Sequence, residues 1–246
     1  MLSSFRSVCL LALLLTTQPV LAHKLRLVAD IWPPFTDASM ANGGLATELV
    51  TTALTNAGYT TEFEQVPWAR AMLGLSEGRY DVLINAWYSD ERTQIGVFSS
   101  GYWLNRIMFI KRKNVPVQYH GDLAAFYAAS IAVVRGYAYA PAFDIDDQLH
   151  KVPVHNFSMA VRMLAAERVE LTLEDELVAR YFLQREPQAV RDRLEFLPEP
   201  LTENRLRILV SLKTPDHDKI VAAFDREIDA MKANGSYDRL MKRYGM

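Results

Sequence analysis

The same order of features occurs twice in this chain, in Gly78-Arg79-Tyr80-Asp81-Val82-Leu83 and in Glu167-Arg168-Val169-Glu170-Leu171-Thr172. Each stretch leads from the end of a predicted helix, through an arginine and a carboxylate, into an apolar strand. Around both stretches the hydrophobic pattern alternates between periods of two and 3.6 residues, which is typical of alternating strands and helices. The sequence therefore predicts an α/β fold of two lobes, each a mostly parallel sheet flanked by helices, with a ligand cleft between them.

Several connecting segments carry signals of their own. Tyr102 to Arg112 predicts long extended segments, and Asn114-Val115-Pro116 is expected to interrupt them. Pro198-Glu199-Pro200 predicts a loop between two strands, and Ser158 is the expected cap of a helix that runs to Ala166.

The composition excludes some classes of protein. The chain has 246 residues, half of them hydrophobic, with 27 Lys and Arg against 29 Asp and Glu. This balance lacks the basic excess that nucleic-acid binding needs, so we expect no nucleic-acid partner. Gly and Pro, at 11 each, are too few for a disordered or collagen-like chain.

Residues 1–22 have the pattern of a secretory signal peptide. A positively charged start is followed by the apolar run Val8 to Leu15 and by small residues ending at Ala22. The alternative is an N-terminal membrane anchor, although the apolar run is short for a membrane span. Cleavage after Ala22 would remove the only cysteine, Cys9, and would leave an exported, soluble protein in the periplasm that starts at His23.

The common catalytic and metal-binding motifs do not occur. The sequence has no Gly-x-Ser-x-Gly elbow, and Gly43-Gly44 lies outside any phosphate-binding loop pattern. The histidines lack the spacing of zinc ligands. We therefore expect no catalytic residues, no metal and no cofactor.

Aromatic residues gather in the predicted first lobe. Trp32 ends the first strand and is followed by Phe35 within three residues, and Trp87 and Tyr88 end the third strand. In open α/β sheets, ligands bind outside the carboxyl ends of the strands, which favours Trp32 and Tyr88 as cleft-lining residues. Trp68 and Trp87 fit a cleft or a core position equally well. The fourth tryptophan, Trp103, is interpreted as core.

Two neighbouring motifs resemble a known family. Ser89-Asp90-Glu91-Arg92 and then Val97-Phe98-Ser99-Ser100-Gly101-Tyr102 are similar to the family-3 extracellular solute-binding proteins, the amino-acid receptors of ABC importers. Trp32-Pro33-Pro34-Phe35, Val134-Arg135-Gly136 and Leu173-Glu174-Asp175-Glu176 continue the resemblance in the same order. It covers essentially residues 24 to 245.

The resemblance implies a type II periplasmic-binding fold, with lobe 1 at 23–112 plus 206–246 and lobe 2 at 113–205. It implies that Arg92 grips the carboxylate of the ligand, for which a planar guanidinium is well suited. It also implies that Asp175 binds the ammonium group. The alternatives are a surface ion pair for Arg92 and a helix-dipole role for Asp175.

The sequence departs from the family pattern beside the expected ligand. Trp87-Tyr88 stands where small or hydroxyl residues are usual, and Tyr137 replaces the usual threonine after Gly136. These rings reshape the pocket and favour an aromatic or cationic relative of an amino acid. Arg70, on the first turn of a predicted helix, is a further candidate ligand contact, although its position also fits a solvated helix face.

Three functions follow from the resemblance. The first is a periplasmic receptor, expected to be a monomer, that delivers a small polar solute to the membrane permease of an ABC importer on separate chains. The second is an enzyme like the cyclohexadienyl dehydratases, with Glu170 or Glu174 as its acid. The third is a ligand-sensing module, although the sequence shows no signalling domain or second membrane span.

Overall fold

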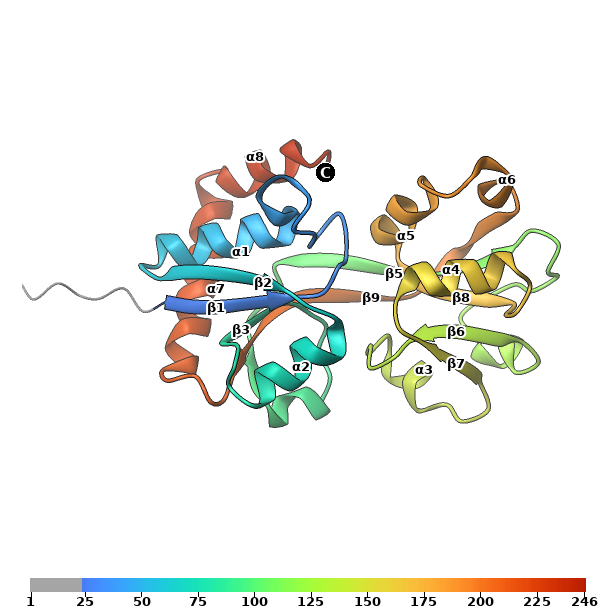
Figure 1. Cartoon of the computed structure of the whole chain (residues 1–246), viewed down its shortest axis with the longest axis horizontal. Coiled ribbons are helices and arrows are strands. Elements are labelled where there is room, and N and C mark those ends of the chain that lie inside the picture. The colour runs from blue at the N-terminus through green and yellow to red at the C-terminus, as the bar shows by residue number, and fades with distance from the viewer. Residues whose placement is uncertain (1–23) are drawn as a thin grey trace, which may run out of the picture.

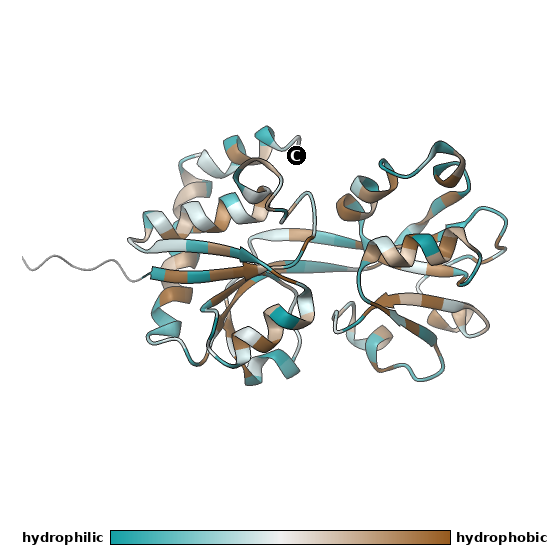
Figure 2. Cartoon of the chain, viewed as in Figure 1, coloured by the Kyte–Doolittle hydropathy of each residue, from teal (hydrophilic) through white to brown (hydrophobic). Residues whose placement is uncertain are grey.

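The computed structural model describes residues 24–246 and shows two halves joined by long strands (Figure 1). The expected signal peptide, residues 1–22, lies outside the described residues. Within residues 24–246 no helix is long and apolar enough to cross a membrane. In Figure 2 apolar residues, brown, occur along both strands and helices, and the helices also carry hydrophilic bands. Apolar sides of this kind allow helices and sheets to pack against one another in layers.

The first half is built on three parallel strands, β1 (Lys24–Ala29), β2 (Thr60–Gln65) and β3 (Val82–Ala86), in the order β2-β1-β3. All five residues of β3 are buried, as expected of a strand covered on both faces. The short strand β4 (Gly96–Phe98) pairs with the long strand β9 (Leu194–Ser211), which returns from the second half. The helices of this half are α1 (Leu45–Asn56), α2 (Trp68–Ser76), α7 (His217–Ala233) and α8 (Ser236–Arg243).

The second half repeats the same plan. Its parallel strands are β6 (Ser130–Val134), β7 (His150–Val154) and β8 (Leu171–Asp175), with β6 in the middle. The side chain of Glu170 accepts hydrogen bonds from Ser130 and ties the start of β8 to the start of β6. The helices here are α3 (Pro141–Ile145), α4 (Phe157–Ala165), α5 (Glu176–Leu183) and α6 (Gln188–Arg191).

Two long antiparallel strands, β5 (Trp103–Arg112) and β9 (Leu194–Ser211), connect the halves. The strand order is β2-β1-β3-β9-β5-β8-β6-β7, so β9 borders the first half and β5 borders the second. Pairing of β5 with β8 begins at Ile107. The passage between the halves in β5 therefore lies before Ile107, and we propose a lobe boundary nearer Asn105 than the predicted one at Arg112.

Two local predictions were wrong. Pro198-Glu199-Pro200 is not a loop, because β9 continues through it, and the pairing register with β5 shifts around Met108, which pairs with Pro200. An extended backbone accommodates the fixed φ of proline, and a register shift absorbs its missing N–H. The cap of α4 is Asn156 and not Ser158, since the Asn156 side chain accepts a hydrogen bond from the Met159 amide at 2.9 Å.

Candidate functional site

A small cavity lies between the two halves. The side chains that line it come from five positions in the first half and from Tyr137 in the second: Trp32, Trp68, Asn85, Trp87, Arg92 and Tyr137. The cavity has a volume of only about 10 Å³. That is room for roughly one water molecule, whereas small-molecule sites enclose about 300 Å³ or more. The halves are in direct contact around the cavity.

Arg92 is the only charged residue that lines the cavity within the described chain. It lies in a short 3-10 helix, η2 (Glu91–Gln94), and is 5% exposed. Its guanidinium donates to the backbone carbonyls of Trp87 at 2.6 Å and of Gly136 at 2.9 Å. Burial lowers the pKa of Arg92 to about 10, so the side chain remains a cation at neutral pH. Two of its five N–H groups are used in these bonds, and three remain.

Gly136 joins the halves through its backbone. Its carbonyl oxygen accepts hydrogen bonds from Arg92 and, at 3.1 Å, from Trp68 Nε1. Its φ of 77° lies in the left-handed region that favours glycine. The guanidinium of Arg92 lies 5.0 Å from the centre of the Trp68 ring, which is cation–π distance. The predicted positions Trp68, Arg92 and Gly136 therefore meet at one end of the cavity.

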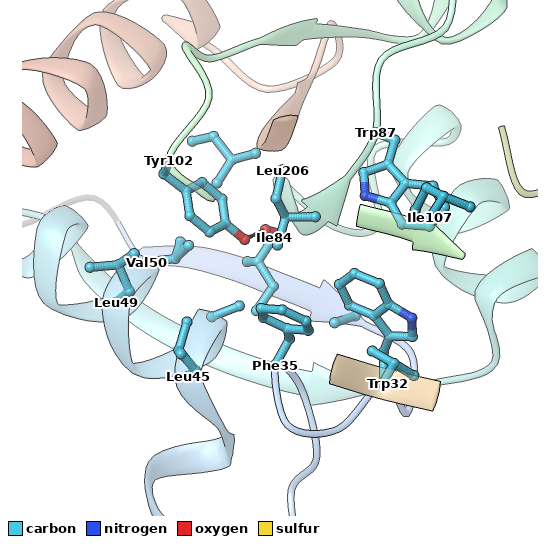
Figure 3. Close-up of a cluster of buried hydrophobic side chains, with 14 of the residues drawn as sticks. Trp32, Phe35, Leu45, Leu49, Val50, Ile84, Trp87, Tyr102, Ile107 and Leu206 are labelled. Atoms are coloured by element: carbon cyan, nitrogen blue, oxygen red, sulfur yellow. Dashed lines mark hydrogen bonds between the residues drawn. The ribbon is translucent and has the colours of Figure 1, made fainter. Parts of the chain in front are cut away.

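Aromatic rings form the remaining walls. Trp32 and Trp87 meet edge to face with centroids 5.5 Å apart, and Tyr137 lies edge to face against Trp87 at 5.8 Å and Trp68 at 5.4 Å. Figure 3 shows Trp32 and Trp87 near each other, with Phe35 beside Trp32. Phe35 stacks on Trp32 at 4.6 Å and is fully buried, so it supports the wall from behind.

Two buried carboxyl groups lie directly behind these rings. Asp30 accepts hydrogen bonds from Asn85 at 2.9 Å and from the hydroxyl of Tyr137 at 3.0 Å. Glu174 accepts from Trp32 Nε1 at 3.1 Å and from the amide of Asp175 at 2.9 Å, while its Oε2 atom has no hydrogen-bond partner in the described chain. Loss of water around both groups raises their pKa, that of Glu174 to about 8. This pKa favours the protonated, neutral form of Glu174 at pH 7.

Sequence reasoning did not select Asp30 or Asn85, and it considered Glu174 only as the acid of an enzyme. The position of Asp30 at the carboxyl end of β1 was a usable signal, because sites in α/β sheets form there. The contacts of Asp30 with Tyr137 and of Trp32 with Glu174 span 107 and 142 positions. They depend on how the halves pack, which local sequence patterns do not encode.

Asp175 caps helix α5. One carboxylate oxygen accepts from the amides of Leu177 at 2.9 Å and Val178 at 3.0 Å, and the other accepts from Asn105 at 2.8 Å. Loss of water around the group raises its pKa to about 6. Both oxygens are engaged inside the protein, which corresponds to the helix-terminus alternative and leaves little capacity for a ligand ammonium.

Arg70 and Tyr88 lie away from the cavity. Tyr88 is 54% exposed and donates a hydrogen bond to Asp90 at 2.7 Å. Successive side chains of an extended segment point to opposite sides, so the inward position of Trp87 turns Tyr88 outward. Arg70 is exposed on α2 because two residues are about 200° of helical rotation from the buried Trp68.

Comparisons with known proteins identify the family. Residues 25–246 match the family described as bacterial extracellular solute-binding proteins, family 3. The match covers most of the chain, and the chain belongs to this family. No curated protein sequence matches the chain.

Solved structures share the fold at low sequence identity. A mutant of ArgBP from T. maritima has a TM-score of 0.74 at 19% identity, over 89% of this chain and 94% of that one. A histidine kinase sensor domain with similarity to periplasmic binding proteins has a TM-score of 0.76 at 18% identity, over 90% and 96%. The ancestral amino acid-binding protein AncCDT-1, a precursor of cyclohexadienyl dehydratase, has a TM-score of 0.70 at 19% identity, over 89% and 94%.

These matches confirm the predicted family resemblance and the predicted fold class, a two-lobed α/β fold of the type II periplasmic-binding kind. The names of the matched structures include amino-acid-binding proteins, a sensor domain and the precursor of an enzyme. The fold is therefore shared by proteins of different function, and the function must be argued from the site.

Proposed function

We propose that this protein captures a small polar solute, an amino acid or a related carboxylate, in the periplasm. It delivers the solute as a monomer to the membrane permease of an ABC importer on separate chains. The observation that carries the proposal is Arg92, a buried cation between the halves with N–H groups left for an anion. Membership of the solute-binding family supports the same function.

The charge of Arg92 explains why the solute carries a carboxylate. Among residues 24–246 the side chain forms no ion pair, although it is almost completely buried. A buried charge without a paired counterion is costly, and a ligand anion would remove that cost. The guanidinium also presents a planar fork that fits a carboxylate with two parallel hydrogen bonds.

Entry of such a solute requires the halves to separate. The cavity is too small for an amino acid, and Trp68 and Arg92 of the first half both bond to Gly136 of the second. Hinge motion around connecting segments is a general way for a two-lobed protein to admit and enclose a ligand, and periplasmic binding proteins are among the established examples. We propose that β5 and β9 bend between the halves.

Arg92→Ala tests this function. A thermal-shift screen of amino acids and small carboxylates first identifies a ligand, because a ligand at 100 times its Kd stabilises by about 2.7 kcal/mol. Calorimetric titration of the variant should then show affinity weakened about 30-fold to several thousand-fold, as expected for loss of one partner of a desolvated charge pair. Arg92→Lys should restore only part of the affinity, because an ammonium cannot form the fork.

Arg70→Ala is the matched control. It removes the same charge from an exposed position in the same half and should leave the affinity unchanged. Equal affinities of wild type and Arg92→Ala would refute the carboxylate grip, and failure of every compound in the screen would count against solute capture itself.

Glu174 favours a second candidate, an enzyme resembling the cyclohexadienyl dehydratases. A carboxylic acid that stays protonated at neutral pH, with a free buried oxygen, has the properties of a general acid for a leaving hydroxyl group. Glu170 does not share these properties, because hydrogen bonds from Ser130 lower its pKa. Incubation with prephenate or arogenate tests the enzyme: product formation that disappears in Glu174→Gln would support it, and no product with wild type would exclude these substrates.

A further inference from the structure

We infer that the solute is a zwitterion whose cationic group is a methylated ammonium, held among the aromatic walls while Arg92 holds its carboxylate. This inference rests on the proposed function and names the chemical class of the solute. It depends on which groups of the cavity could contact a cation and on where those groups lie relative to Arg92.

The aromatic walls present π surfaces and no free polar atoms. The indole nitrogens of Trp32, Trp68 and Trp87 donate to Glu174, to the Gly136 carbonyl and to Asn105 respectively. The Tyr137 hydroxyl likewise donates to Asp30. Each ring is therefore fixed in orientation by its polar end, and each can contribute only its face or edge to a ligand. Perpendicular rings around a small space are the arrangement that recognises quaternary ammonium groups.

A primary ammonium group would be poorly satisfied in this cavity. It has three N–H donors that need acceptors when they leave water. Among the residues that line the cavity in the described chain, Asn85 Oδ1 is the buried side-chain acceptor without a partner. The Gly136 carbonyl already accepts from Trp68 and Arg92. A fully methylated ammonium has no N–H group and therefore avoids this cost.

The charged groups are unevenly placed around the cavity. Arg92 lies against the face of Trp68, and Trp68 contacts Tyr137. Tyr137 in turn contacts Trp87, and Trp87 contacts Trp32. Trp32 bonds to Glu174, so the acid lies against the Trp32 wall, whereas the cation Arg92 lies against Trp68. A carboxylate is favoured beside Arg92, and a cation is favoured against the ring faces that Arg92 does not occupy.

The acids behind the walls support a cationic ligand group. Asp30, Glu174 and Asp175 are buried near one another, and mutual repulsion adds to burial in raising the pKa of Glu174. A positive charge close to them would offset that repulsion, as an opposite charge favours the ionised form of a carboxyl group. The departure of Trp87 and Tyr137 from the usual small and hydroxyl residues thus replaces hydrogen-bonding groups with surfaces suited to methyl groups.

The test is a methylation series on a constant carboxylate. Titration calorimetry compares glycine with N-methylglycine, N,N-dimethylglycine and N,N,N-trimethylglycine, and a second series starts from 4-aminobutyrate to allow a longer spacing. In at least one series, affinity should rise with methylation, by at least about tenfold from the primary to the quaternary ammonium. Choline, which has the cation without the carboxylate, should bind at least about tenfold more weakly than the best zwitterion.

Two variants locate the effect. Trp32→Leu should reduce the ratio of quaternary to primary affinity, whereas Trp32→Phe, which keeps an aromatic face, should retain more of it. Melting curves of both variants show whether they fold. If Trp32→Leu does not fold, Trp87→Leu removes the neighbouring ring of the wall in its place, and a ratio equal to that of wild type would contradict the inference.

The outcomes separate this inference from the proposed function. Tighter binding of an ordinary amino acid than of every methylated analogue would overturn the inference and leave solute capture intact. No binding by either series or by any compound of the amino-acid and carboxylate screen would overturn both. A rising series whose ratio depends on Trp32 supports both.

Discussion

The folded protein should become less stable as the pH rises from about 6 to 8, and Glu174→Gln should abolish much of this loss of stability. In the folded protein the pKa of Glu174 is raised from 4.5 to about 8, chiefly because the side chain is completely buried. Between those two values the folded protein keeps the proton and the unfolded chain releases it. Unfolding therefore becomes more favourable as the pH rises. The contribution is fully present below pH 4.5 and is lost by the time the pH passes 8.

The size of the effect follows from the difference in pKa, 8 − 4.5 = 3.5. At about 1.36 kcal/mol per pH unit, the whole loss is roughly 5 kcal/mol, of which about 2 kcal/mol falls between pH 6 and 8. The window from pH 6 to 8 is chosen because Asp175, with its pKa raised to about 6, adds a loss in the same direction at lower pH. Asp30 also has a raised pKa and remains in the variant as a common background.

Urea denaturation at pH 6, 7 and 8 measures the free energy of unfolding of wild type and variant. Wild type should lose about 2 kcal/mol more than Glu174→Gln across this window, or about 4–8 °C in Tm for a protein of this size. Glu170→Gln is the matched control, since hydrogen bonds from Ser130 lower the pKa of Glu170 and its ionisation falls below the window. Parallel slopes for wild type and Glu174→Gln would show that Glu174 is ionised in the folded protein, and the reasoning about the neutral acid would fail.

Three further predictions concern export, motion and local stability. Mass spectrometry of protein from the native envelope should show His23 as the first residue, and an intact Met1 would contradict the predicted signal peptide. Without ligand, X-ray scattering should give a radius of gyration larger than that calculated from the structure, since the halves must separate to admit a solute, and saturating ligand should reduce it; an unchanged radius would favour a rigid pocket. Asn156→Ala should destabilise the protein by about 1 kcal/mol in denaturant titration, because it removes the cap of α4, whereas Ser158→Ala should have a smaller effect.

Much of the site was predictable because it gathers at the ends of strands. Trp32 and Trp87 follow β1 and β3, and these parallel strands end at the same edge of one sheet. Arg92 was found through the family motif, and the structure places it with Trp68, Gly136 and Tyr137. Their roles toward a ligand remain proposals.

The errors have physical causes that a local pattern does not reveal. Whether a side chain faces the cavity depends on the local backbone, as the outward Tyr88 beside the inward Trp87 shows. The family resemblance implied a ligand contact for Asp175, with a helix-terminus role as the alternative, and its oxygens are occupied by α5 and Asn105, which meet only in the folded chain. Pro198 and Pro200 predict a break, yet the pairing of β9 with β5 keeps the segment extended.

The hydrogen bonds that close the halves are made by the residues that form the cavity. Trp68 and Arg92 bond to Gly136, Tyr137 bonds to Asp30, and Trp32 bonds to Glu174, each across the two halves. These bonds break when the halves separate, and at about 0.5–1.5 kcal/mol each they set how much a bound solute must supply to restore closure. Because the cavity is too small for an amino acid, an enclosed solute displaces some of these bonds and must replace the contacts that it breaks. Selection of the solute and closure of the halves are therefore coupled through the same side chains.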